Sequence, residues 1–164
     1  MAGVFDGIED VKKDEGDSSR PFITEGTYIL ELERSISKKG TNPAKDSFEE
    51  DIVITEFTVL EVLRSVEGVS LKAGEQCVDI KVLFRKRDVL TDQGKRNMGR
   101  VKAIYGAALG GVPDEAVTAA ACGKIVEGAG TLLAGTRVKC AAVRGKPSKT
   151  NGKVYTNLTW SFVG

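Results

Sequence analysis

The chain has 164 residues, enough for one domain but not for two hydrophobic cores of normal size. Its 41% hydrophobic and 29% charged residues, with a formal net charge of +1, are typical of a soluble globular protein and argue against fibrous, membrane-embedded and wholly disordered chains. It contains no histidine, which excludes Ser-His-Asp and Cys-His catalysis, histidine-ligated metal sites and imidazole acid–base chemistry.

The sequence predicts an acidic N-terminal arm over residues 1–20 and a folded domain over residues 21–164. The arm is rich in aspartate and glutamate and has few apolar anchors. It also lacks the basic-then-apolar pattern of a secretion signal. Three cysteines, Cys77, Cys122 and Cys140, lie far apart, and an odd number of them is typical of buried thiols in a reducing compartment. We therefore expect a cytoplasmic protein.

Three strands are predicted in the first half of the domain. Residues 26–37 alternate between apolar and polar side chains, as a half-buried strand does. Residues 38–47 are rich in lysine, glycine, asparagine and proline and predict a loop. Residues 51–63 are β-branched and aromatic, with apolar side chains on both faces, which favours a long curling strand with a bulge near residues 59–60. Residues 75–85 predict the third strand. The side chains expected to face the core are Tyr28, Leu30, Leu32 and Ile36 in the first strand and Val78, Ile80, Val82 and Phe84 in the third.

The second half of the domain predicts one or two helices and two more strands. Residues 94–109 carry apolar side chains spaced by three and four, typical of an amphipathic helix, and residues 113–126 favour a short second helix. Residues 137–144 and 154–163 predict the last two strands. Three strands, a helix and two strands is the element order of a five-stranded Greek-key barrel of the OB type, with the helix between strands three and four. We therefore predict a mainly β protein of this class.

Basic residues are concentrated in the later part of the chain, although the net charge is near zero. Residues 1–56 contain 14 acidic and 7 basic residues, whereas residues 57–164 contain 9 acidic and 17 basic ones. Residues 135–164 hold six basic residues and no acidic residue. Such asymmetry favours a polyanionic partner, because clustered cations raise a local potential that the net charge hides. The alternative is an ordinary solvated face.

The two loops that flank the binding face of an OB barrel, after its first and fourth strands, are both basic here. Proteins that bind single strands need cations for phosphates and aromatic rings for bases. The candidate loop cations are Lys38, Lys39, Lys45, Lys146, Lys149 and Lys153. Further phosphate-contacting candidates are Arg85, Lys86 and Arg87 after the third strand and Arg137, Lys139 and Arg144 on the outward side of the fourth. Tyr155 and Phe48 are the candidates for base stacking, whereas Trp160 and Phe162 are expected in the core.

No motif points to an enzyme. Residues 94–101 contain two glycines but lack the Lys-Ser/Thr pair of a phosphate-binding loop. Glu49, Glu50 and Asp51 are consecutive, so in a strand they point to opposite faces and make a poor two-metal site. We expect no catalytic residues, no metal site and no cofactor.

Several stretches together resemble small phage-encoded single-stranded-DNA-binding proteins. They are an opening strand with Gly26 and Tyr28, a strand with the sequence FTVL at 57–60, and a basic hairpin that ends in the Tyr-Thr-Asn sequence at 155–157. The resemblance covers roughly residues 22–163. It implies an OB fold that coats single-stranded DNA during replication or recombination. Many such proteins carry an acidic tail that recruits partner proteins, and here the acidic N-terminal arm is the candidate for that role.

The leading expectation is thus sequence-independent binding of single-stranded DNA by a non-enzymatic protein. A structural or adaptor protein, such as a small virion component, is the first alternative. A nuclease or recombination enzyme is the second, and RNA is an alternative ligand, since stacking and phosphate contacts do not by themselves read the 2′-hydroxyl. The sequence leaves the oligomeric state open.

Overall fold

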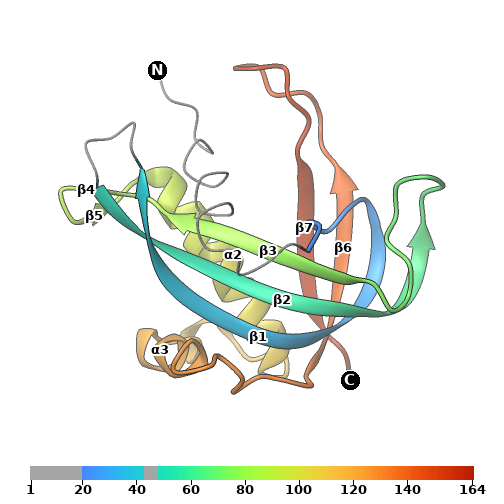
Figure 1. The fold of residues 1–164 in the computed structure, drawn as a ribbon, viewed down its shortest axis with the longest axis horizontal. Coiled ribbons are helices and arrows are strands. Elements are labelled where there is room, and N and C mark those ends of the chain that lie inside the picture. The colour runs from blue at the N-terminus through green and yellow to red at the C-terminus, as the bar shows by residue number, and fades with distance from the viewer. Residues whose placement is uncertain (1–19, 43–47) are drawn as a thin grey trace.

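A strongly curved, five-stranded antiparallel sheet forms the centre of the protein in a computed structural model that describes residues 20–42 and 48–164 (Figure 1). The strand order is β3-β2-β1-β6-β7, and a separate small hairpin pairs β4 with β5. The strands are β1 (Gly26–Asn42), β2 (Phe48–Ser65), β3 (Gln76–Leu83), β4 (Arg85–Lys86), β5 (Val89–Leu90), β6 (Arg137–Arg144) and β7 (Thr156–Phe162). The helices are α2 (Asp92–Ala108) and α3 (Ala119–Ile125), with a 3-10 turn over Asp114–Ala116 between them.

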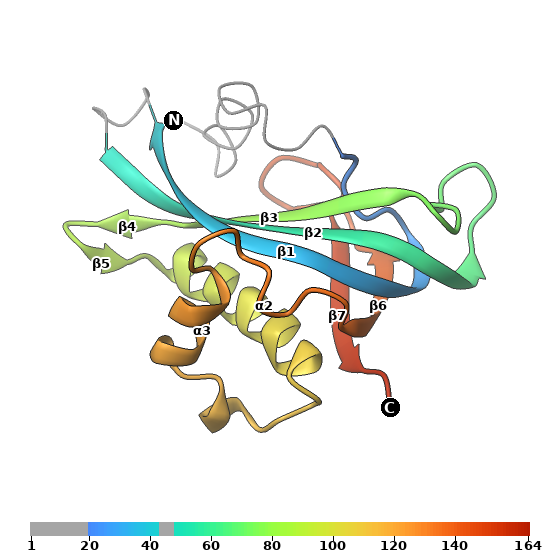
Figure 2. The same cartoon turned by 60° about the horizontal axis from the view of Figure 1, so that its bottom comes forward.

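The mainly β architecture with two helices agrees with the prediction, and α2 does follow the third long strand. The expected closed barrel, however, is not formed by the described residues. Strands β3 and β7 are the two edges of the sheet and do not pair with each other. Instead α2 packs against both β3 and β7, and Figure 2 shows it lying beneath the sheet. The helix therefore occupies the side where strand pairing would close a barrel.

Helix α2 starts on a well-formed cap. The Thr91 side chain accepts a hydrogen bond from the Gly94 backbone N–H at 3.0 Å, and Asp92 places a negative charge in the first turn. Its apolar stripe, with Val101, Ile104 and Tyr105, is buried against the sheet. The sheet supplies fully buried side chains such as those of Leu30, Leu32, Phe57, Val138 and Cys140 to the same core.

The register between β1 and β2 shifts at three places, and the two nearest the middle of β1 set which side chains face this core. The register passes from Ile29↔Glu61 to Leu30↔Val59, which leaves Leu60 as an extra residue and confirms the bulge predicted near residues 59–60. A second shift leaves Glu33 extra on β1. An extra residue reverses the alternation, so Ile36 faces away from α2 and joins a second apolar cluster, contrary to the expectation that it shares a face with Tyr28.

That second cluster also contains Val78, Ile80, Val82 and Phe84, which were expected to face a single core. They are buried, but on the sheet face opposite α2, because Cys77 and Leu83 take the helix side of β3. Both faces of the β2–β3 region are therefore apolar, as the two-sided pattern in residues 51–63 suggested. None of the helices formed by the described residues is long and apolar enough to cross a membrane.

Candidate functional site

The first group of predicted cations lies around Asp51 of β2, at the end of the sheet where β3 leads into the β4–β5 hairpin. Asp51 on β2 pairs with two of them, at 2.6 Å from its Oδ1 to Lys39 Nζ and 3.8 Å from its Oδ2 to Arg85 Nε. Lys86 and Arg87 are exposed. Arg87 and Asp88 form a two-residue turn with positive φ angles of 50° and 64°, which places both side chains at the tip of the hairpin.

Three further predicted site residues belong to this end of the sheet. Lys38, near Lys39 on β1, is half-buried. Lys45 lies outside the described residues, and Phe48 begins β2 with a side chain that the structure does not describe. The stacking role expected of Phe48 therefore stays a prediction.

The second group forms a basic arm, residues 145–155, between β6 and β7. Its two legs are joined by hydrogen bonds from the Gly145 N–H to the Tyr155 carbonyl and from the Ser148 N–H to the Lys153 carbonyl, both at 2.8 Å. Gly152, with φ of 69°, closes the tip through a further bond to the Ser148 carbonyl. Figure 1 shows the arm projecting beyond the sheet. The predicted basic loop is thus a hydrogen-bonded extension of the β6–β7 hairpin.

The basic arm combines cations with one aromatic side chain. Lys146, Lys149 and Lys153 are exposed, as is Arg144 at its base. Tyr155 is 38% exposed, and its hydroxyl accepts a hydrogen bond from Asn151 Nδ2 at 2.9 Å. The phenol ring is therefore held on the arm among three lysines, which is the combination that single-strand binding needs.

The third group, Arg137 and Lys139, lies on the outward face of β6, as predicted, while Val138 and Cys140 are fully buried. The cross-strand neighbours of the two cations differ. Arg137 stands opposite Glu31 of β1, whereas the cross-strand neighbours of Lys139 are the uncharged Ile29 and Ser161. Lys139 therefore presents its charge with less local compensation.

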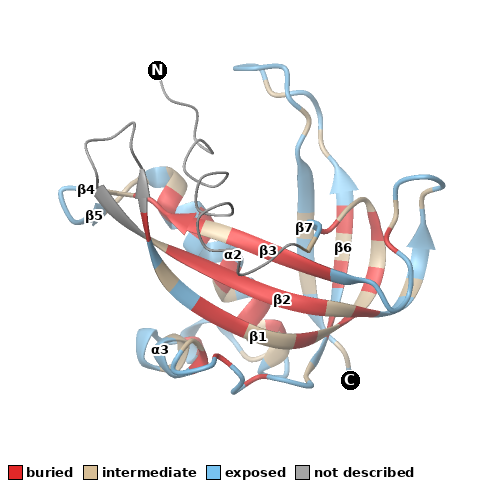
Figure 3. Ribbon diagram, in the orientation of Figure 1, coloured by how far each residue is buried: buried red, intermediate tan, exposed pale blue. Residues whose placement is uncertain are grey.

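These groups do not merge into one patch. Residue Gly26 at the start of β1 pairs with Ala142 next to the basic arm, while Asn42 at the far end of β1 leads to the other predicted loop. The outward face of β2 and β3 between them is apolar, and the middle of β2 and most of β3 are buried (Figure 3). It also holds a network in which Arg20 and Arg34 both pair with the buried Glu56. Phe84, the aromatic residue that follows β3 on that face, is only 4% exposed, so its ring is not accessible for base stacking.

The two halves of the fold differ in how many of their cations form ion pairs. Between described residues, ion pairs engage Arg20, Arg34, Lys39, Lys81 and Arg85, all within the β1 to β4 half. None of the six cations in residues 135–164 takes part in an ion pair with a described residue. The cations of this acid-free stretch therefore form no ion pair with a described residue, although Arg137 lies opposite Glu31 and the Arg144 backbone N–H donates to Glu25 Oε2 at 3.4 Å.

Of the two aromatic residues expected in the core, Trp160 packs against its margin and Phe162 is largely exposed. Trp160 is only half-buried and stacks on Phe57, with ring centroids 5.2 Å apart and 24° between planes. Phe162 is 51% exposed, because β7 is an edge strand and no further strand covers it. Trp160 also lines an open pocket with Arg96 and Arg100 of α2. Neither of these two arginines was among the site residues predicted from the sequence.

The shifted ionisable groups are buried thiols and a phenol. Burial raises the pKa of Cys77 and of Tyr105 to about 12 each and also raises the pKa of Cys122 and Cys140. All four therefore stay neutral near pH 7. Among the described residues, no cluster of cysteine, aspartate and glutamate side chains has the composition of a metal site.

The chain matches no protein-family model and shows no significant similarity to a curated protein.

Proposed function

We propose that this protein binds single-stranded DNA without sequence preference and protects it during phage DNA replication, recombination or repair in the host cytoplasm, without enzymatic activity. We further infer that the sheet is an open form of the OB fold. The OB fold is a partly open five-stranded Greek-key barrel. An antiparallel sheet of five long strands, with α2 between the third and fourth of them, supports that assignment.

The observation that carries the proposal is that the cations of the β6–β7 hairpin form no ion pair with a described residue and lie beside an exposed aromatic ring. Its exposed cations lie on an arm whose backbone is held by hydrogen bonds. The arm backbone therefore loses less conformational entropy on binding than that of a flexible loop would. Phosphates would displace counterions from Lys146, Lys149 and Lys153, and no ion pair between described residues has to break. Tyr155 would stack on a base. This stacking favours single-stranded over duplex DNA, because a duplex hides the faces of its bases.

The test is fluorescence anisotropy of labelled oligo-dT and of the matching duplex at several salt concentrations. We expect tighter binding to the single strand and a steep loss of affinity with salt. The double variant Lys149→Ala/Lys153→Ala should reduce the slope of log affinity against log salt by about 2. The matched control Lys72→Ala/Lys124→Ala removes the same charge from exposed positions outside the arm and should change the slope little.

Tyr155→Ala tests the stacking contribution separately. Stacking is worth about 1–3 kcal/mol per base, so affinity for oligo-dT should fall roughly 5- to 150-fold with an unchanged salt slope. Equal binding to oligo-dT and duplex would reduce the function to a generic basic surface. Absence of binding to both would favour the structural or adaptor role instead. The recruitment of partner proteins by residues 1–20 stays a prediction, since residues 1–19 lie outside the described part of the chain.

A further inference from the structure

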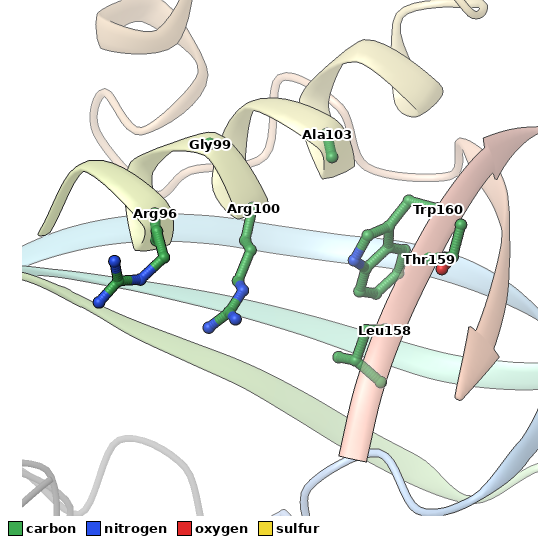
Figure 4. Close-up of a pocket in the computed structure, with 7 residues that line it drawn as sticks. All are labelled: Arg96, Gly99, Arg100, Ala103, Leu158, Thr159 and Trp160. Atoms are coloured by element: carbon green, nitrogen blue, oxygen red, sulfur yellow. The ribbon is translucent and has the colours of Figure 1, made fainter. Parts of the chain in front are cut away.

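An open pocket of about 340 Å³ lies between the exposed face of α2 and strand β7 (Figure 4). This volume is at the lower end of the range of small-molecule sites, about 300–1,000 Å³. A Cβ placed on Gly99 would meet no atom within 4 Å, so the small residues of α2 leave the space empty. The lining residues used below are Arg96, Gly99, Arg100 and Ala103 of α2 and Leu158 and Trp160 of β7.

The charged side of the pocket consists only of hydrogen-bond donors. Arg96 and Arg100 are one helical turn apart, and their guanidinium groups point to the same side of α2 (Figure 4). Each donates to a neutral acceptor on the helix, Arg96 to Gln93 Oε1 at 2.8 Å and Arg100 to Asn97 Oδ1 at 3.3 Å. Neither forms an ion pair with a described residue. Two like charges at this spacing repel each other, and an anion between them would relieve that repulsion.

A buried amide orients this side of the pocket. Asn97 is only 1% exposed, and its Nδ2 donates to the Val82 carbonyl at 2.8 Å. Its Oδ1 accepts from Arg100 and, at 2.9 Å, from Gln93 Nε2. The two arginines are thus tied through Asn97 to strand β3 of the sheet, which preorganises them for a ligand.

The opposite wall is apolar with one polar atom. Phe57 covers one face of the Trp160 ring and fixes its position. The indole N–H has no hydrogen-bond acceptor among the described residues, and Figure 4 places the ring nitrogen on the side facing Arg100. Leu158 lies beside the ring. A ligand that satisfies the whole pocket therefore combines an anionic group, a flat apolar body and a hydrogen-bond acceptor.

We propose that this pocket holds one nucleotide of the bound single strand, with its phosphate between Arg96 and Arg100 and its base against Leu158 and Trp160. This inference rests on the proposed DNA-binding function and extends it from the basic arm to the helix side of the protein. The basic arm precedes β7 and the pocket lies along β7, so a strand that leaves Tyr155 can pass along the free edge of β7 to reach Trp160. The strand would then contact the protein at two aromatic residues.

Trp160 is the only tryptophan in the chain, so its fluorescence reports on the pocket alone. The full chain is titrated with oligo-dT while intrinsic tryptophan fluorescence and the anisotropy of a labelled oligo-dT are recorded under the same conditions. The anisotropy measures binding anywhere on the protein. We expect quenching of Trp160 to saturate at the same oligo-dT concentration as the anisotropy.

Two variants test the charge and the shape of the pocket separately. Arg100→Ala should weaken oligo-dT binding about tenfold and lower the salt slope by about 1. Lys95→Ala removes the same charge from a neighbouring exposed position that does not line the pocket, and it should have a much smaller effect. Gly99→Leu adds a bulky apolar side chain at the wall of the pocket without changing any charge, and its Cβ would meet no atom within 4 Å. It should abolish the quenching and weaken binding several-fold while the helix content stays unchanged.

The outcomes separate the pocket from the general function. Coincident quenching and anisotropy, both reduced in Gly99→Leu and Arg100→Ala but not in Lys95→Ala, would support the pocket. Normal anisotropy without quenching, with Arg100→Ala no weaker than Lys95→Ala, would overturn the pocket and leave DNA binding to the basic arm. If neither signal changes, the proposed function fails together with the pocket.

Discussion

Gly94 lies in the first turn of α2, and replacing it with alanine tests whether this helix rests directly on the end of β3. A Cβ on Gly94 would lie 2.2 Å from the carbonyl oxygen and 3.0 Å from the backbone nitrogen of Phe84. Gly94 is not one of the glycines with a positive φ angle, so alanine would suffer only from this steric overlap. The ordinary closest approach of carbon to a carbonyl oxygen is about 3.3 Å. The start of α2 must therefore move away from β3 by roughly 1 Å.

Such a movement affects the hydrogen bonds that join the two elements. The Thr91 N–H donates to the Phe84 carbonyl at 2.9 Å, and Asn97 Nδ2 donates to the Val82 carbonyl at 2.8 Å. Overpacking costs about 1–3 kcal/mol, and each hydrogen bond lost costs about 1 kcal/mol more. Alanine returns about 0.5–1 kcal/mol through its helix propensity. The free energy of unfolding should therefore fall by about 2–4 kcal/mol, which lowers the melting temperature by roughly 5–15 °C at this chain length.

The control is the same substitution on the same helix at Gly99, where a Cβ meets nothing within 4 Å. Gly99→Ala should raise the free energy of unfolding by about 0.5–1 kcal/mol. Both variants can be measured by urea unfolding, followed by far-ultraviolet circular dichroism and by Trp160 fluorescence. A Gly94→Ala protein as stable as the wild type would show that α2 does not contact Phe84 as described, and the orientation of Arg96 and Arg100 would then lose its basis.

Two further predictions concern buried polar groups. The Tyr28 hydroxyl donates to the Thr24 carbonyl at 2.8 Å and accepts from the Leu71 N–H at 3.1 Å, so Tyr28→Phe leaves both groups without this partner and should cost about 1–3 kcal/mol in urea unfolding; an unchanged midpoint would contradict the buried network. Burial raises the pKa of Cys77 and Tyr105 from 9.0 and 10.0 to about 12 each, so above pH 9 the unfolded chain loses these protons before the folded protein does. The free energy of unfolding should therefore be independent of these groups below pH 9 and fall as the pH rises from 9 towards 12. Tyr105→Phe should lessen this fall. An equally steep decline in that variant would exclude Tyr105 as a cause.

The strands were predictable where side-chain alternation alone defines them. The strand predicted at 137–144 is found with the same bounds as β6. Strands β1 and β2 run further than predicted, because their hairpin continues through polar residues to the pair Asn42↔Phe48. Backbone hydrogen bonds between neighbouring strands do not require apolar side chains, so polar sequence does not reveal where such a hairpin ends.

The curvature of the sheet was harder to anticipate. The bulge at Leu60 was predicted because the alternation visibly changes phase there, whereas the one at Glu33 leaves no comparable mark in the sequence. It reverses the side on which Ile36 lies. The prediction of a closed barrel was wrong for a related reason. Closure depends on where α2 packs relative to β3 and β7, and the side-chain pattern within a strand does not determine that.

For the candidate site, the sequence predicts the positions of charges but not their partners. Lys39, Arg85 and Lys81 look as cationic in the sequence as Lys149 does, yet the first two share Asp51 and the third pairs with Asp79 at 2.5 Å. Only a stretch without acidic residues, such as 135–164, limits pairing before the fold is known, because its cations have no carboxylate nearby in sequence or across their own hairpin. The same reasoning missed the pocket on α2. The alternation correctly turns Trp160 towards the inside of the sheet, but on an edge strand that inner face stays partly open, and the arginines of a neighbouring helix can complete a binding site there.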